Sequence, residues 1–159
     1  MKSKIIFFSI ITISLVINMG CGDKFTENLR DKHIIPYVSV YMEIDTKLGG
    51  ESNLETPGRP LYMNVSHPSG KPLGYDGHGI IVIRLNDTEY KCWDATCTNC
   101  SDLTSCFIQK DLEGEIAICP VCQANFSLRY GSPFNLTEKV YPLKEYGITK
   151  SGNKLIIRN

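Results

Sequence analysis

Residues 92–106 read CWDATCTNCSDLTSC, and residues 116–131 read IAICPVCQANFSLRYG. Each stretch contains two cysteines that are separated by two residues, and a spacer of this length lets both sulfurs face one metal ion. Two such pairs, separated by about 15–20 residues, are typical of a site with four thiolate ligands. The sequence therefore predicts one metal site with four ligands: Cys97, Cys100, Cys119 and Cys122.

The spacing does not identify what the four cysteines hold. They are consistent with a two-iron, two-sulfide cluster, and equally with one zinc ion in a closed structural site that has no open coordination position. They are also consistent with two disulfides that link one pair to the other, because exported proteins often fold in oxidising compartments. Cys92 and Cys106 flank the first pair without a nearby partner and could form one further disulfide.

The N-terminus has the layout of an export signal. Lys2 and Lys4 precede an apolar run over 5–17, and the first acidic residue is Asp23. The apolar stretch is about 15 residues long, whereas a helix that crosses a bilayer needs about 20 residues. We therefore expect residues 1–20 to be a signal peptide that the mature protein lacks.

Cys21 stands directly after this segment, between Gly20 and Gly22, which resembles the lipobox of bacterial lipoproteins. Asn18 differs from the Leu that usually lies three positions before such a cysteine, and a plain secreted protein is the alternative. In lipoproteins the cysteine carries acyl chains, each buried CH₂ contributes about 0.8 kcal/mol, and several chains give stable anchoring. We expect Cys21 to be lipidated, residues 21–33 to form a tether, and the protein to lie on a membrane of the bacterial cell envelope.

The charge of the chain argues against a nucleic-acid partner. The full chain has 17 basic and 17 acidic side chains; without residues 1–20, which include two lysines, the remaining 139 residues have 15 and 17, a net charge of −2. A polyanion-binding protein needs a basic surface. The sequence also shows no pairing of a nucleophile with a base, so we expect neither enzyme activity nor a small-molecule substrate.

The mature chain is expected to fold as one all-β domain over 34–159. No stretch of ten or more residues shows the 3.6-residue periodicity of a helix, whereas several short stretches alternate and are rich in β-branched and aromatic residues. We predict strands over 37–44, 61–65, 79–85, 89–93, 116–118, 126–128, 140–146 and 154–157. Hairpin turns are expected at 86–87 and at 151–153.

The second half of the chain, from about Ile80, resembles a Rieske iron–sulfur domain. Four segments carry the resemblance: 93–100, in the place of the first cluster loop, 119–131, 142–146 and 152–157. The resemblance implies stacked antiparallel sheets with a small cysteine-loop subdomain over 92–130. It also implies that the domain binds a two-iron, two-sulfide (2Fe-2S) cluster and transfers electrons to a redox partner protein.

Three positions depart from the Rieske pattern. The two cluster histidines of the family fall on Asn99 and Cys122, and the loop glycine that follows the second histidine is Gln123. All three histidines of the chain lie outside the cysteine region. Two imidazole ligands raise the reduction potential to about −150 to +300 mV, against about −400 mV for all-thiolate clusters of the plant type. A cluster in this chain would therefore have thiolate ligands only and a low potential.

Overall fold

The computed structural model describes residues 35–47, 52–134 and 140–159. The predicted signal peptide, the lipidated Cys21 and the tether over 21–33 lie outside the described residues. Within the described ranges no helix is long and apolar enough to cross a membrane. These residues form β-strands and short 3-10 helices without an α-helix, which confirms the predicted all-β fold class.

The described residues form three antiparallel sheets. The first has the strand order β1-β10-β9, with β1 over Tyr41–Asp45, β10 over Lys154–Arg158 and β9 over Gly147–Ser151. The second has the order β2-β3-β4, with β2 over Pro60–Met63, β3 over Ile80–Arg84 and β4 over Tyr90–Asp94. The third has β5 (Leu112–Glu113), β6 (Ile116–Ile118), β7 (Asn125–Ser127) and β8 (Pro133–Phe134) in sequence order. The 3-10 helices are η1 (Ser52–Glu55), η2 (Tyr75–Gly77) and η3 (Gln109–Asp111).

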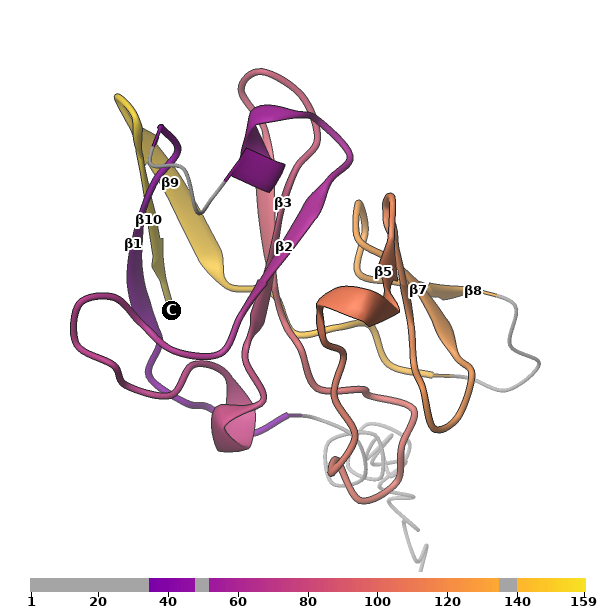
Figure 1. The fold of residues 1–159 in the computed structure, drawn as a ribbon. Coiled ribbons are helices and arrows are strands. Elements are labelled where there is room, and N and C mark those ends of the chain that lie inside the picture. The colour runs from indigo at the N-terminus through magenta and orange to yellow at the C-terminus, as the bar shows by residue number, and fades with distance from the viewer. Residues whose placement is uncertain (1–34, 48–51, 135–139) are drawn as a thin grey trace, which may run out of the picture.

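The second sheet lies between the other two (Figure 1). Successive side chains of a strand point to opposite faces of its sheet. On β3, Ile81 and Ile83 therefore pack in a core that contains the cysteines, whereas Ile80 and Val82 pack with residues of β1 and β10. All four side chains are fully buried, so β3 contributes to both cores, as does β4 through Trp93 on one face and Cys92 on the other.

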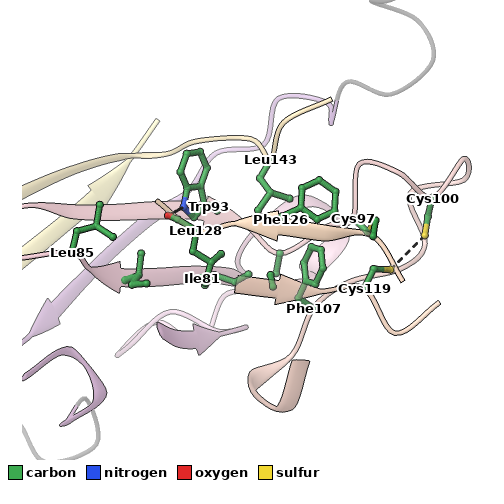
Figure 2. Packing of buried hydrophobic residues seen from close by; sticks show 14 residues of the cluster. Ile81, Leu85, Trp93, Cys97, Cys100, Phe107, Cys119, Phe126, Leu128 and Leu143 are labelled. Carbon is green, nitrogen blue, oxygen red and sulfur yellow. Dashed lines mark hydrogen bonds between the residues drawn. The ribbon is translucent and has the colours of Figure 1, made fainter. Parts of the chain in front are cut away.

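The first of these clusters, which we call the cysteine-side core, connects the second sheet to the third. Phe107 and Phe126 lie at its centre and contact each other edge to face, with ring centroids 5.6 Å apart. The indole Nε1 of Trp93 donates a hydrogen bond of 2.7 Å to the Leu128 carbonyl, which joins β4 to the end of β7. Figure 2 shows three of the site cysteines at one end of this core and Leu85 at the other.

The predicted strand over 140–146 is wrong. In that segment the backbone is irregular and makes a single β-bridge, between Glu145 and Trp93. Pro142 has no amide hydrogen with which to pair. The strand beside β10 is β9, in which Ile148 is the only bulky apolar residue, so apolar alternation could not reveal it. The hairpin turn at 151–153 is where we predicted it, because Ser151 pairs with Lys154.

Candidate metal centre

The structure brings the four predicted ligands together. The Sγ atoms of Cys97 and Cys122 are 3.6 Å apart, and those of Cys100 and Cys119 are 3.7 Å apart. All four Sγ atoms lie within 4.8 Å of one another. A tetrahedral ion with metal–sulfur bonds of about 2.3 Å has its ligands about 3.8 Å apart, so the four side chains fit such an ion.

The four cysteines are free thiols in the structure. The disulfides that the sequence left open, each of which would link one C-x-x-C pair to the other, are therefore not formed. Disulfide sulfurs lie about 2.05 Å apart, much closer than the nearest sulfurs of this site. The structure thus agrees with a site that is arranged for a metal.

Loop 1, residues 95–107, carries the first pair and is closed by backbone hydrogen bonds. The amide of Phe107 donates to the carbonyl of Ala95 at 2.8 Å, and the amide of Cys97 donates to the carbonyl of Ser105 at 2.8 Å. Inside the loop, the amide of Leu103 donates to the carbonyl of Cys100 at 3.1 Å. These bonds turn the chain back on itself, so that both sulfurs of the pair point to the same side.

Loop 2, residues 118–125, carries the second pair and connects β6 to β7. The amide of Cys119 donates to the carbonyl of Ala124 at 2.9 Å, and the amide of Gln123 donates to the carbonyl of Cys119 at 3.0 Å. Gln123 has a φ of 58°, in the left-handed region that favours glycine. This is the position at which the resemblance described in the sequence analysis would place a glycine. The left-handed conformation costs Gln123 some backbone strain, and its side-chain amide donates to the Pro120 carbonyl at 3.2 Å.

The thiols of the site are largely shielded from water. Cys97 and Cys119 are fully buried, Cys100 is 8% exposed, and Cys122 is half-buried. The contact between Cys100 and Cys119 is drawn as a dashed line at the end of the cysteine-side core in Figure 2. Burial of a charged group is costly unless it is paired, so four thiolates in this position need a cation between them.

The pKa values of the thiols differ because their surroundings differ. Burial raises the pKa of Cys97, and it raises the pKa of Cys100 to about 12. Burial acts in the same direction on Cys119, but hydrogen bonds from the Cys122 amide and from the Ser105 hydroxyl outweigh it and lower the pKa to about 7. The Ser105 hydroxyl lies 3.4 Å from the Cys119 sulfur. Cys119 is therefore the thiol most readily available as a thiolate near neutral pH.

The disulfide between Cys92 and Cys106 that the sequence left possible is not formed in the structure, where both are free thiols. Cys92 lies on β4, and its side chain is fully buried in the core between the first and second sheets. Cys106 is half-buried in loop 1, where it forms a β-bridge with Thr96. Because alternate residues of β4 face opposite sides, Cys92 points away from the core in which the cysteine site lies.

No histidine among the described residues belongs to the thiolate cluster. His78 instead contacts the hydroxyl of Thr96 through Nδ1 at 2.9 Å. Two further residues bear on the site that we did not single out from the sequence: Ser105, described above, and Asp94. A single serine or aspartate carries no spacing signal, because partners such as Cys119 for Ser105 and Tyr146 for Asp94 lie far away in the chain.

The fold and the site define the class of protein: a small all-β domain with a cluster of four cysteines that fits one metal ion. No family model matches the chain, and no curated protein matches it. Several solved structures are similar to it. The ferredoxin of carbazole 1,9a-dioxygenase from Nocardioides aromaticivorans IC177 has 18% identity, a TM-score of 0.42, and covers 76% of this chain and 97% of its own.

Two other similar structures have comparable scores. Sphingomonas yanoikuyae B1 ferredoxin has 18% identity, a TM-score of 0.44, and covers 65% of this chain and 88% of its own. A protein described as the small subunit of an NADH-dependent nitrite reductase from Mycobacterium tuberculosis has 13% identity and a TM-score of 0.43. Its alignment covers 77% of this chain and 97% of its own. All three identities are below 20%, and all three TM-scores are below 0.5.

Proposed function

We propose that the four thiolates hold a single zinc ion, which joins loop 1 to loop 2 as a structural cross-link. The observation that carries the proposal is that all four sulfurs lie within 4.8 Å of one another. Zinc takes four cysteine ligands in closed tetrahedral sites, with Zn–S bonds of about 2.3 Å. Four protein ligands leave no open coordination position, so the proposal includes no enzyme activity and no small-molecule substrate.

The small third sheet supports a structural role for the ion. Its strands β5 and β8 have 2 residues each, and β6 and β7 have 3 residues each. Strands in globular proteins are usually about 5–6 residues long, so these strands add few backbone hydrogen bonds. Binding of zinc to a four-ligand site is worth about 10–16 kcal/mol in zinc-finger peptides, and this free energy stabilises the folded state. A metal cross-link between loop 1 and loop 2, which connects β6 to β7, should therefore contribute much of the stability of the third sheet.

A two-iron cluster that transfers electrons is the second candidate. Two thiolates would bind each iron, and the bridging sulfides would separate the two pairs, so a group of sulfurs as tight as this one fits a single ion better. Hydrogen bonds to the Cys119 sulfur favour the second candidate, because such bonds tune the reduction potential of iron–sulfur sites. A redox partner protein would then approach at Val121, which is 72% exposed next to the half-buried Cys122.

Metal analysis distinguishes the two candidates. The full chain is purified from a bacterial host in the absence of oxygen, and its zinc, iron and visible absorption are measured. We expect one equivalent of zinc and a colourless protein. Two equivalents of iron and a brown colour would contradict the zinc site and support the two-iron cluster that transfers electrons. A protein that contains neither metal and takes up neither after reduction would contradict both candidates.

Binding of zinc is expected to release protons in a way that depends on pH. Only the thiolate binds the ion, so a thiol whose pKa lies above the ambient pH must lose its proton. At pH 8 this applies at least to Cys97 and Cys100, whose pKa values are raised. At pH 6 it applies to Cys119 as well, because its pKa is about 7. Affinity should therefore fall as the pH falls, and calorimetry in two buffers should detect about one more released proton at pH 6 than at pH 8.

We further propose that the protein is anchored to the bacterial cell envelope by lipid on Cys21. The order of basic residues, apolar run and cysteine in the first 21 residues supports this proposal. Fractionation of cells that produce the wild type or Cys21→Ser tests it. We expect the wild type in the membrane fraction and the variant in the soluble exported or unprocessed fraction; the same distribution for both would contradict lipid anchoring.

A further inference from the structure

Asp94, the last residue of β4, is a fully buried carboxylate that makes three hydrogen bonds. Its Oδ1 accepts the backbone amide of Thr96 at 2.9 Å. Its Oδ2 accepts the backbone amide of Tyr75 at 2.7 Å and the hydroxyl of Tyr146 at 2.6 Å. Three donors from three separate segments therefore converge on one side chain, three residues before Cys97.

This carboxylate is not explained by an ion pair. In the described part of the chain, no Lys, Arg or His lies within ion-pair distance of Asp94. The charge of Lys144 acts on Asp94, but from beyond ion-pair distance. Burial of a carboxylate costs free energy, which hydrogen bonds offset, so Asp94 need not add net stability. The role of Asp94 is therefore better sought in the position of the segments that it joins than in net stability.

The segments that Asp94 joins are those that hold loop 1. The amide of Asp94 donates to the Lys144 carbonyl at 2.8 Å, and its carboxylate binds Tyr146, so residues 144–146 run alongside the start of the loop. The hydroxyl of Thr98 donates to the Tyr141 carbonyl at 2.6 Å, farther along the same segment. Loop 1 thus depends on contacts with parts of the chain that lie far away in sequence.

Loop 2 is turned by hydrogen bonds between its own backbone groups. Its two backbone hydrogen bonds, from Cys119 to Ala124 and from Gln123 to Cys119, stay within the loop and the start of β7. The geometry of the second cysteine pair is therefore set locally. The distance between the two pairs, in contrast, depends on where loop 1 is held.

We propose that Asp94 is a positioning residue of the metal site: its carboxylate fixes the start of loop 1, so that Cys97 and Cys100 meet Cys119 and Cys122 at the spacing of one ion. The proposal rests on the metal-binding function proposed above. It assigns to Asp94 an effect on metal affinity, through the Thr96 amide and the 144–146 segment, although Asp94 does not touch a ligand sulfur.

The test is a titration of the reduced, metal-free full chain with Co²⁺, whose absorption reports tetrahedral thiolate coordination, followed by competition with Zn²⁺. Asp94→Asn keeps the size of the side chain but replaces an acceptor by a donor. Outer residues that orient metal ligands typically contribute 10–100-fold to affinity, and we expect a loss of about tenfold with a weaker Co²⁺ band. Tyr146→Phe removes one of the three donors, for which we expect about threefold.

Asp102→Asn is the matched control. Asp102 lies in loop 1, is exposed, and accepts the Thr104 amide at 3.2 Å, so the substitution removes the same charge without touching the Asp94 contacts. We expect it to leave the affinity and the Co²⁺ spectrum unchanged. A folded Asp94→Asn protein with wild-type affinity would overturn the proposal.

Two further outcomes of the titration have separate meanings: a variant that does not fold, and a wild type that does not bind metal. If Asp94→Asn does not fold, Tyr146→Phe decides: wild-type affinity in that variant overturns the positioning role, and a loss with an altered Co²⁺ band supports it. If the wild type itself binds neither Co²⁺ nor Zn²⁺, the proposed metal-binding function has failed, and the role of Asp94 fails with it.

Discussion

Cys119→Ser is expected to lower the affinity of the site for zinc by at least about a hundredfold. The zinc-binding free energy of about 10–16 kcal/mol, divided among four thiolates, gives about 3 kcal/mol for each, which corresponds to about a hundredfold in affinity. Cys119 is fully buried, and its pKa of about 7 makes it the thiolate that is available first. Serine offers a hydroxyl that does not ionise at neutral pH. Zinc retained against a chelator, measured per protein, checks the prediction.

Cys106→Ser is the control for this experiment. Cys106 is a half-buried free thiol in the same loop as two of the ligands, but it is not one of the four clustered sulfurs. The variant should keep one equivalent of zinc and the wild-type resistance to the chelator. If Cys106→Ser loses the metal as readily as Cys119→Ser, the ligand set assigned here is wrong. If neither variant loses it, the metal lies elsewhere.

Gly74→Ala is expected to destabilise the domain by about 3 kcal/mol or more, since an unusual backbone conformation costs about 1–3 kcal/mol and overpacking about 1–3 kcal/mol. Gly74 has a φ of 74° and a ψ of 179°, a conformation that side chains rarely adopt. An added Cβ would lie 2.1 Å from the Gly79 carbonyl oxygen and 2.9 Å from its carbon. The Gly79 amide donates to the Leu73 carbonyl at 2.7 Å, so the clashing backbone cannot move without breaking that bond. Urea unfolding measures the change in free energy.

Gly58→Ala is the comparison for a positive φ without a clash. Gly58 has a φ of 77°, almost the same as that of Gly74, but a Cβ there would have no atom within 4 Å. We expect it to cost about 1 kcal/mol, the contribution of the left-handed conformation alone. If the two substitutions lower the free energy of unfolding equally, the predicted clash with Gly79 is contradicted. Because Tyr75 follows Gly74 and donates to Asp94, Gly74→Ala should also weaken metal binding.

The strands were predictable where alternation is strong. The stretches 79–85 and 89–93 became β3 and β4, which pair from Ile80 with Asp94 to Arg84 with Tyr90. The strand β9 was not predictable, because an exposed edge strand needs no apolar alternation. The prediction of a strand over 140–146 was wrong because apolar residues there do not mark a strand. Leu143 packs into the cysteine-side core from an irregular segment.

The four clustered cysteines could be predicted from the sequence, whereas the residues that hold the two loops in place could not. The C-x-x-C spacing is a local property, and it led to the four cysteines that the structure brings together. The possible pairing of Cys92 with Cys106 could not be decided from the sequence, because an even number of cysteines says nothing about which face of a strand each one occupies; in the structure both are free. Ser105 and Asp94 carry no signal in the sequence, since their partners lie up to 52 positions away.

The short alternating stretches of the sequence were enough to predict the all-β class, and the spacing within each pair was enough to identify the four candidate ligands. That the two pairs meet follows from the packing of the sheets. Cys97 and Cys122 are 25 positions apart and their sulfurs are 3.6 Å apart. That distance depends on how loop 1 is held by Asp94 and by residues 141–146, and these contacts form only when the sheets pack. Local geometry is encoded by neighbours in the chain, whereas the spacing of two loops depends on every segment that lies between them.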